Sequence, residues 1–71
     1  MASVKRIMVV TINGKNYEIG DGVILRLKTG KVLVGIINQI ILRLKDGVKR
    51  YIIVLAVDYS LIEIDVDMID D

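Results

Sequence analysis

Residues 23–47 constrain the fold most, because one eight-residue pattern occurs there twice. Val-Ile-Leu-Arg-Leu-Lys-Thr-Gly at positions 23–30 returns as Ile-Ile-Leu-Arg-Leu-Lys-Asp-Gly at positions 40–47. In each copy leucine alternates with a cation, so the leucines face one side of an extended chain and the cations face the other. Each copy ends in a Thr-Gly or Asp-Gly turn signal and leads into another β-rich segment, which is typical of a hairpin. The pattern predicts two consecutive hairpins built on half-buried strands.

β-rich segments also fill most of the remaining chain. Residues 7–12 and 15–19 flank Asn13-Gly14, which tolerates the positive φ angles of a type I′ hairpin turn. Residues 61–68 alternate between apolar and acidic side chains. Gly35, in the middle of an apolar run, indicates a bulge, a sharp bend or a close approach of two backbones. These features predict an all-β fold with one domain over residues 1–71, a small five- to six-stranded and strongly bent barrel.

The apolar content is high for so short a chain. Its 71 residues bury only a modest core, and the absence of Cys and His removes disulfides and zinc as staples. Yet 54% of the residues are apolar, and residues 32–37 and 51–57 are apolar on both strand faces. A barrel core takes only one face, so we expect another subunit or the amino-terminal hairpin to cover the second face. We predict a homo-oligomer with Val32, Val34, Ile36, Ile53 and Leu55 at the interface.

The same composition leaves little for catalysis. There is no His or Cys to act as a base, ligand or nucleophile, and Ser3 and Ser60 have no evident partner base. We therefore expect no enzymatic activity, no cofactor and no small-molecule substrate. The longest uncharged stretch, between Lys31 and Arg43, is too short to span a bilayer as a helix, and residues 7–12 lack a signal-peptide cleavage site. The expectation is a cytoplasmic protein without a membrane partner.

A net charge of +1 hides a strong asymmetry along the chain. All ten Lys and Arg residues lie within residues 1–50, whereas residues 51–71 carry six carboxylates and no cation. This split indicates either a basic binding face beside an acidic tail or strands that pair opposite charges, and we favour the second interpretation. Glu63, Asp65 and Asp67 share one strand face and could bind Ca²⁺ or Mg²⁺ weakly. We instead predict that they lie beside cations from the repeats, with no metal site.

The basic residues of the two repeats suggest a phosphate-binding patch. They fall on strand faces or beside two equivalent turns, where a pair of hairpins could bring them together, and such a patch attracts phosphate. Against this, the absence of Phe and Trp leaves three tyrosines as the only platforms for stacking bases or binding proline-rich peptides. The predicted nucleic-acid-binding residues are Arg26, Lys28, Lys31, Arg43, Lys45, Lys49 and Arg50.

One stretch resembles the first motif of the Sm-like small-barrel family. Leu-Lys-Thr-Gly at positions 27–30, then Lys31 and a second glycine at position 35, match that motif and its structural glycines, which Src-homology-3-like barrels partly share. The resemblance implies a bent five-stranded sheet whose protomers join edge to edge into RNA-binding rings. Asn38-Gln39 stands where the family has an Asp and an Asn for RNA. Residues 58–60 replace the Arg-Gly or Lys-Gly of the second motif, and a hairpin replaces the amino-terminal helix.

Two functional hypotheses follow. The first is a non-enzymatic module that binds nucleic acid through a basic face, with RNA favoured over DNA. The alternative is a structural or protein-interaction module that self-assembles through apolar strands and has no nucleic-acid role.

Overall fold

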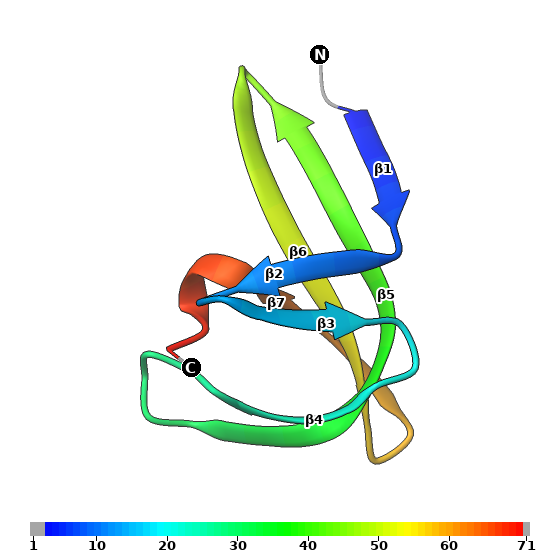
Figure 1. The fold of residues 1–71 in the computed structure, drawn as a ribbon, viewed down its shortest axis with the longest axis vertical. Helices are drawn as coiled ribbons and strands as arrows, with labels where there is room; N and C mark the ends of the chain where they lie inside the picture. The colour runs from blue at the N-terminus through cyan, green and yellow to red at the C-terminus, as the bar shows by residue number, and fades with distance from the viewer. Residues whose placement is uncertain (1–2, 71) are drawn as a thin grey trace.

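Antiparallel strands make up most of the computed structural model, which describes residues 3–70 (Figure 1). The prediction of an all-β fold is confirmed. The elements are β1 (Ser3–Ile7), β2 (Val9–Ile12), β3 (Lys15–Glu18), β4 (Gly22–Arg26), β5 (Val32–Lys45), β6 (Val48–Val57), β7 (Ser60–Asp65) and the 3₁₀-helix η1 (Val66–Met68). Within the described residues, no helix is long and apolar enough to cross a membrane.

β5 is the central strand of the main sheet. β6 pairs with it along one edge, while its other edge is shared by β4, next to the first half of β5, and β1, next to the second half. β7 pairs with the far edge of β6. The segment after β7 returns to β4, where the N–H of Lys28 donates to the carbonyl of Met68 and the N–H of Asp70 donates to the carbonyl of Arg26. The elements of the main sheet therefore follow one another around the core.

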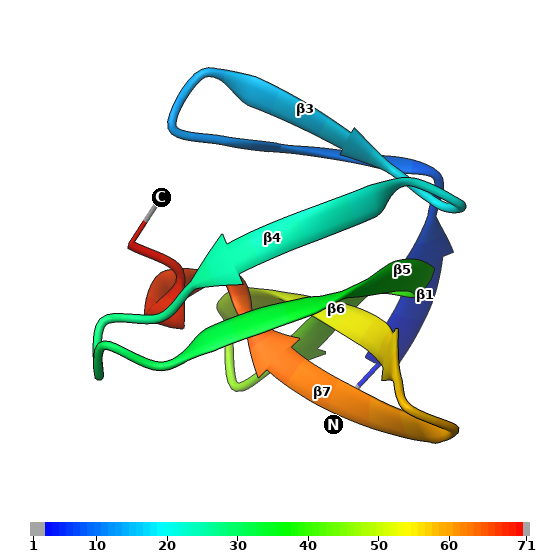
Figure 2. The ribbon, with the colours of Figure 1, turned by 90° about the horizontal axis from the view of Figure 1, so that it is seen from below.

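The β2–β3 hairpin is a separate two-stranded sheet that covers this core. It crosses in front of β6 and β7 in Figure 1, and Figure 2 shows it standing apart from the main sheet on the side of β4. Val10, Ile12 and Tyr17 of the hairpin are buried. They belong to the same cluster as the five most deeply buried side chains, which are Leu25, Ile37, Ile40, Ile53 and Leu55.

Local turn chemistry explains two of the predicted hairpins. Asn13-Gly14 and Asp46-Gly47 have positive φ at both positions, as the type I′ turn requires. The β6–β7 turn has the same form, with φ of 46° at Asp58 and 67° at Tyr59. Tyr59 is an unusual residue for this position, because a bulky side chain makes the left-handed conformation unfavourable.

The two repeats occupy different places in the fold. The first repeat forms β4. The second repeat lies in the same strand as residues 32–37, and together they make up the 14 residues of β5. Asn38-Gln39 does not end the strand, because the β5–β6 register shifts between Ile37 and Gln39 and the extra residue forms a bulge. Of the three alternatives predicted for Gly35, the structure shows a close approach of two backbones, since a Cβ at that position would overlap the carbonyl oxygen of Ala56.

Two predicted boundaries are wrong. The expected strand over residues 7–12 is divided at Met8, because residues 3–7 pair with β5 while residues 9–12 pair with β3. The expected strand over residues 61–68 ends at Asp65. The side chain of Asp65 accepts a hydrogen bond from the N–H of Asp67 at 3.0 Å and thereby caps η1.

Ile53 and Leu55 are also wrong as interface residues. Both are 0% exposed, because Ile53 lies opposite Ile40 and Leu55 lies opposite Ile37, on the side of the sheet that faces the core. On the opposite face of β6, Ile52 is also buried, with an exposed fraction of 5%.

Candidate nucleic-acid interface

The second half of β5, the first half of β6 and β1 form a three-stranded projection beyond the core (Figure 1). We call residues 3–7 and 40–51 the arm. The turn at its tip is Asp46-Gly47, and Asp46 is the only acidic residue that the arm contains. Its cations are Lys5, Arg6, Arg43, Lys45, Lys49 and Arg50. The arm is therefore the most basic part of the chain.

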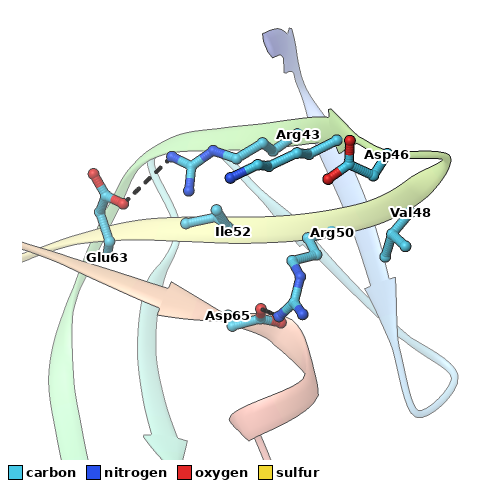
Figure 3. Close-up of a pocket in the computed structure, with 8 residues that line it drawn as sticks. Arg43, Asp46, Val48, Arg50, Ile52, Glu63 and Asp65 are labelled. Carbon is cyan, nitrogen blue, oxygen red and sulfur yellow. Dashed lines mark hydrogen bonds and ion pairs between the residues drawn. The ribbon is translucent and has the colours of Figure 1, made fainter. Parts of the chain in front are cut away.

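On the outer face of the arm, Arg43 lies directly opposite Arg50. Like charges in directly opposed strand positions repel each other, so this pair needs an explanation. β7 provides a carboxylate for each. Arg43 Nη2 lies 3.7 Å from Glu63 Oε1, and Arg50 Nη1 donates to Asp65 Oδ2 at 3.1 Å (Figure 3). The prediction for Glu63, Asp65 and Asp67 is confirmed in part. Glu63 lies beside Arg43 of the second repeat, and Asp65 lies beside Arg50, which follows that repeat. Asp67 forms no ion pair within residues 3–70.

These ion pairs do not exhaust the hydrogen-bonding capacity of the arginines. Each guanidinium carries five N–H donors, and the ion pairs leave most of them free to bind a phosphate oxygen. The side chains remain 40% exposed at Arg43 and 60% exposed at Arg50. An exposed ion pair contributes only about 0–1 kcal/mol. A phosphate can therefore compete with the carboxylates at small energetic cost.

A shallow hollow of about 680 Å³ lies between these side chains (Figure 3). Lys45 lines it beside the two arginines, and Ile52 is buried against it. The aliphatic parts of long arginine side chains commonly cover apolar surface in this way. The hollow thus brings three cations near one another, and its lining also includes two carboxylates of β7 and the carboxylate of Asp46.

The inner face of the arm carries a tyrosine and two lysines. Lys5 and Tyr51 lie on either side of Leu42, and Lys49 lies opposite Leu44, the next residue along the same face. Tyr51 is 37% exposed. A partly exposed aromatic ring flanked by amines can stack on a base while the amines contact its phosphates.

Sequence reasoning missed Lys5, Arg6 and Tyr51 as site residues. The arrangement depends on β1 pairing with the second half of β5, a contact between segments almost forty positions apart. The consecutive cations Lys5 and Arg6, set near the start of a β-rich segment, were the available signal.

The predicted patch is divided in two. Arg26 pairs with Val32 at the beginning of β5, whereas Arg43 and Lys45 lie near its end. The two repeats do not bring their cations together, because one forms an outer strand and the other lies within the central strand. The residues at the first end are Arg26, Lys28 and Lys31, which are all exposed.

The segment that follows β7 lies beside this first group. The backbone N–H of Lys28 donates to Met68 at 2.8 Å, and the carbonyl of Arg26 accepts from Asp70 at the same distance. Asp67 and Asp70 therefore add negative charge near Arg26 and Lys28, and the arm is the better candidate for binding an anion. Over residues 3–70, no three acidic side chains are grouped so that they could hold a metal ion.

Comparison of the chain with protein-family models, with curated proteins and with solved structures finds no match.

Proposed function

We propose that this chain is a small, strongly bent barrel of the Sm-like or Src-homology-3-like kind whose arm binds nucleic acid, RNA in preference to DNA. The carrying observation is the cross-strand pair of Arg43 and Arg50, with Lys45 beside it at the end of a projecting, almost wholly basic arm. These cations repel one another and keep unused N–H donors, so they are suited to a ligand that carries repeated negative charge.

The link between the two ends of the main sheet supports the barrel. Leu27 forms an isolated antiparallel bridge with Ile69, next to the two hydrogen bonds that join this segment to β4. This link and the bulge of β5 both support a main sheet that bends into a small barrel, with the β2–β3 hairpin at one opening.

The inner face of the arm favours a single-stranded ligand. Stacking on Tyr51 requires an unpaired base, and single-stranded RNA offers such bases in loops, bulges and ends. The resemblance of residues 23–37 to the Sm-like motif favours RNA over DNA. The side chains described here include no set of donors and acceptors arranged for one base, so the contact is directed at phosphate and is tolerant of sequence.

The experiment is a salt titration of binding to a fluorescent single-stranded RNA, measured by anisotropy alongside single-stranded and duplex DNA of equal length. If about three phosphates are neutralised, the logarithm of the association constant falls with the logarithm of the salt concentration with a slope of about −2. Affinity should follow the order RNA, single-stranded DNA, duplex DNA. A wild-type protein that shows no salt-sensitive binding to any of them near physiological ionic strength would exclude this function.

Corresponding lysines of the two repeats provide matched variants. Lys45→Glu, in the arm, should weaken RNA binding at least tenfold, whereas Lys28→Glu, at the other end of β5, should change it less than twofold. Both side chains are exposed, so circular dichroism should show the same fold in both. An equal loss of affinity in the two variants would show that the arm is not the binding site.

A further inference from the structure

An unbroken apolar surface lies on the outer side of the main sheet, away from the core. Its members are between 50% and 67% exposed, and we call them the outer band: Ile24 of β4, Val32, Val34 and Ile36 of β5, and Leu61 of β7. An exposed hydrophobic patch of this kind on a small protein commonly marks an interaction site.

The register shows that the outer band is continuous. Ile24 lies directly opposite Val34 on β5, and Ile36 lies opposite Ala56 of β6. Ala56 in turn lies opposite Leu61. The band therefore crosses four neighbouring strands without a charged side chain between its members.

Opposite charges lie at the two ends of the outer band. Arg26 and Lys31 lie at the Val32 end, because Arg26 pairs with Val32 and Lys31 precedes it. Asp21 precedes the Gly22–Ile36 pair at the other end, and Asp58 lies in the turn that joins β6 to β7 there. Over residues 3–70, none of these four forms an ion pair within 4.0 Å. Among these four side chains the charge thus runs from positive through apolar to negative, with Asp70 of the segment after β7 beside Arg26 at the first end.

Tyr59 stands at the negative end, in the same turn as Asp58. Its side chain is fully exposed and its φ is 67°, which is unfavourable for a bulky residue. A strained and exposed aromatic residue beside an apolar surface suits an anchor for a partner, because tyrosine is enriched among the residues that dominate interface energies.

We infer that the outer band docks against the same band of a second copy of this chain, about a two-fold axis that lies between the two sheets and runs across the strands near Ile24 and Val34. This operation reverses the strand direction. It sets apolar against apolar and brings the Arg26 and Lys31 end of each copy over the Asp21 and Asp58 end of the other. When a surface that is positive at one end and negative at the other is turned end for end, its charges face opposite charges of the original. This property favours a second copy of the chain over an unrelated partner.

The size of the surface agrees with a standard dimer. Such an interface takes about 800 Å² from each partner, and the ring of Tyr59 alone can bury roughly 150–250 Å². The five aliphatic side chains of the band supply the apolar centre, and the charged ends supply the polar rim. This dimer does not depend on nucleic-acid binding, because the arm lies at the other end of β5.

The oligomeric state tests the inference directly. Sedimentation over a range of concentrations should give a species of twice the chain mass of 7.9 kDa. Val34→Lys should produce a monomer, because the two-fold axis brings two lysines together in an apolar surface. Val4→Lys is the matched control, since Val4 is 61% exposed against 62% for Val34 and lies on the arm. It should remain a dimer, and circular dichroism should show both variants folded.

Two further measurements test the geometry. The chain has no cysteine, so Val34→Cys introduces a unique thiol, and two sheets packed face to face lie about 10 Å apart. A short bis-maleimide should link two copies of the Val34→Cys variant and leave the Val4→Cys variant unlinked. Lys31→Glu and Asp58→Lys should each weaken the dimer at least tenfold, and the double variant should recover most of the loss.

A wild-type chain that stays monomeric at every concentration would overturn the inference, even if the band then bound a different protein. So would a dimer that Val4→Lys and Val34→Lys disrupt equally, or cross-linking through Val4→Cys alone.

Discussion

Replacement of Gly35 by alanine tests the close contact between β5 and β6 at the bend. A Cβ at this position would overlap the carbonyl oxygen of Ala56 and would also lie 3.0 Å from Val57 Cγ2 and 3.1 Å from Leu55 Cγ. The most severe overlap is with a backbone atom, which cannot turn away as the end of a side chain can. Relief therefore requires β5 and β6 to move apart where Leu55 is fully buried.

The expected magnitude follows from two opposing effects. Overpacking a well-packed site typically costs about 1–3 kcal/mol, and a clash with backbone belongs to the upper part of that range. Against it, replacing glycine with alanine reduces the entropy of the unfolded chain and stabilises the fold by about 0.4–1 kcal/mol. We expect Gly35→Ala to lower the free energy of unfolding by about 2 kcal/mol.

Urea denaturation at a fixed protein concentration measures this change. For a domain of this size the dependence on urea is about 1 kcal/mol per molar, so the midpoint should fall by about 2 M. Gly22→Ala is the matched control, because a Cβ there meets nothing within 4 Å and its φ lies outside the left-handed region. It should be neutral or stabilising. If Gly35→Ala were as stable as Gly22→Ala, the contact between β5 and Ala56 would be refuted.

Three other variants test separate parts of the structure. Tyr59→Gly relieves the left-handed strain, so the melting temperature measured at concentrations where the chain is monomeric should rise, by an amount corresponding to roughly 1 kcal/mol; a fall would contradict the strained turn. The double variant Glu63→Gln with Asp65→Asn should lower the free energy of unfolding, measured by urea titration, by less than about 1 kcal/mol per exposed ion pair. It should nevertheless bind RNA more tightly, because the facing arginines lose their carboxylates. Weaker RNA binding would count against the proposed site. Ile53→Lys should abolish the cooperative melt, because a charge at a fully buried position cannot be solvated, and a folded variant would show that this side chain is not in the core.

The features predicted correctly from sequence are those that depend on neighbouring residues. Asn13-Gly14 and Asp46-Gly47 carry their turn type in their own chemistry, and Gly35 carries the close backbone contact. The turn at Asp58-Tyr59 adopts the same conformation without a glycine, so its type was not evident. Local chemistry therefore predicted the hairpins but not the strain at Tyr59.

The errors concern contacts between distant segments. In residues 51–57 both faces are apolar, so alternation could not show which face enters the core, and Ile53 is directed inward by its pairing with Ile40. Similarly, repetition of sequence did not produce equivalent surroundings. Lys28 and Lys45 correspond in the two repeats, yet they lie at opposite ends of β5, because Lys28 follows β4 beside the start of that strand and Lys45 is its last residue.

The length of β5 has a consequence for hydrogen exchange. Its residues 32–36 pair with β4, and Leu33 and Ile37 are buried in the core, whereas residues 42–45 lie in an arm whose β6 strand has no β7 partner beyond Ile52. The arm amides can exchange with solvent when only the arm opens, while the amide of Ile37 requires disruption of the core. A single strand should therefore contain two cooperative units, one that exchanges in local openings and one that exchanges only when the whole domain unfolds.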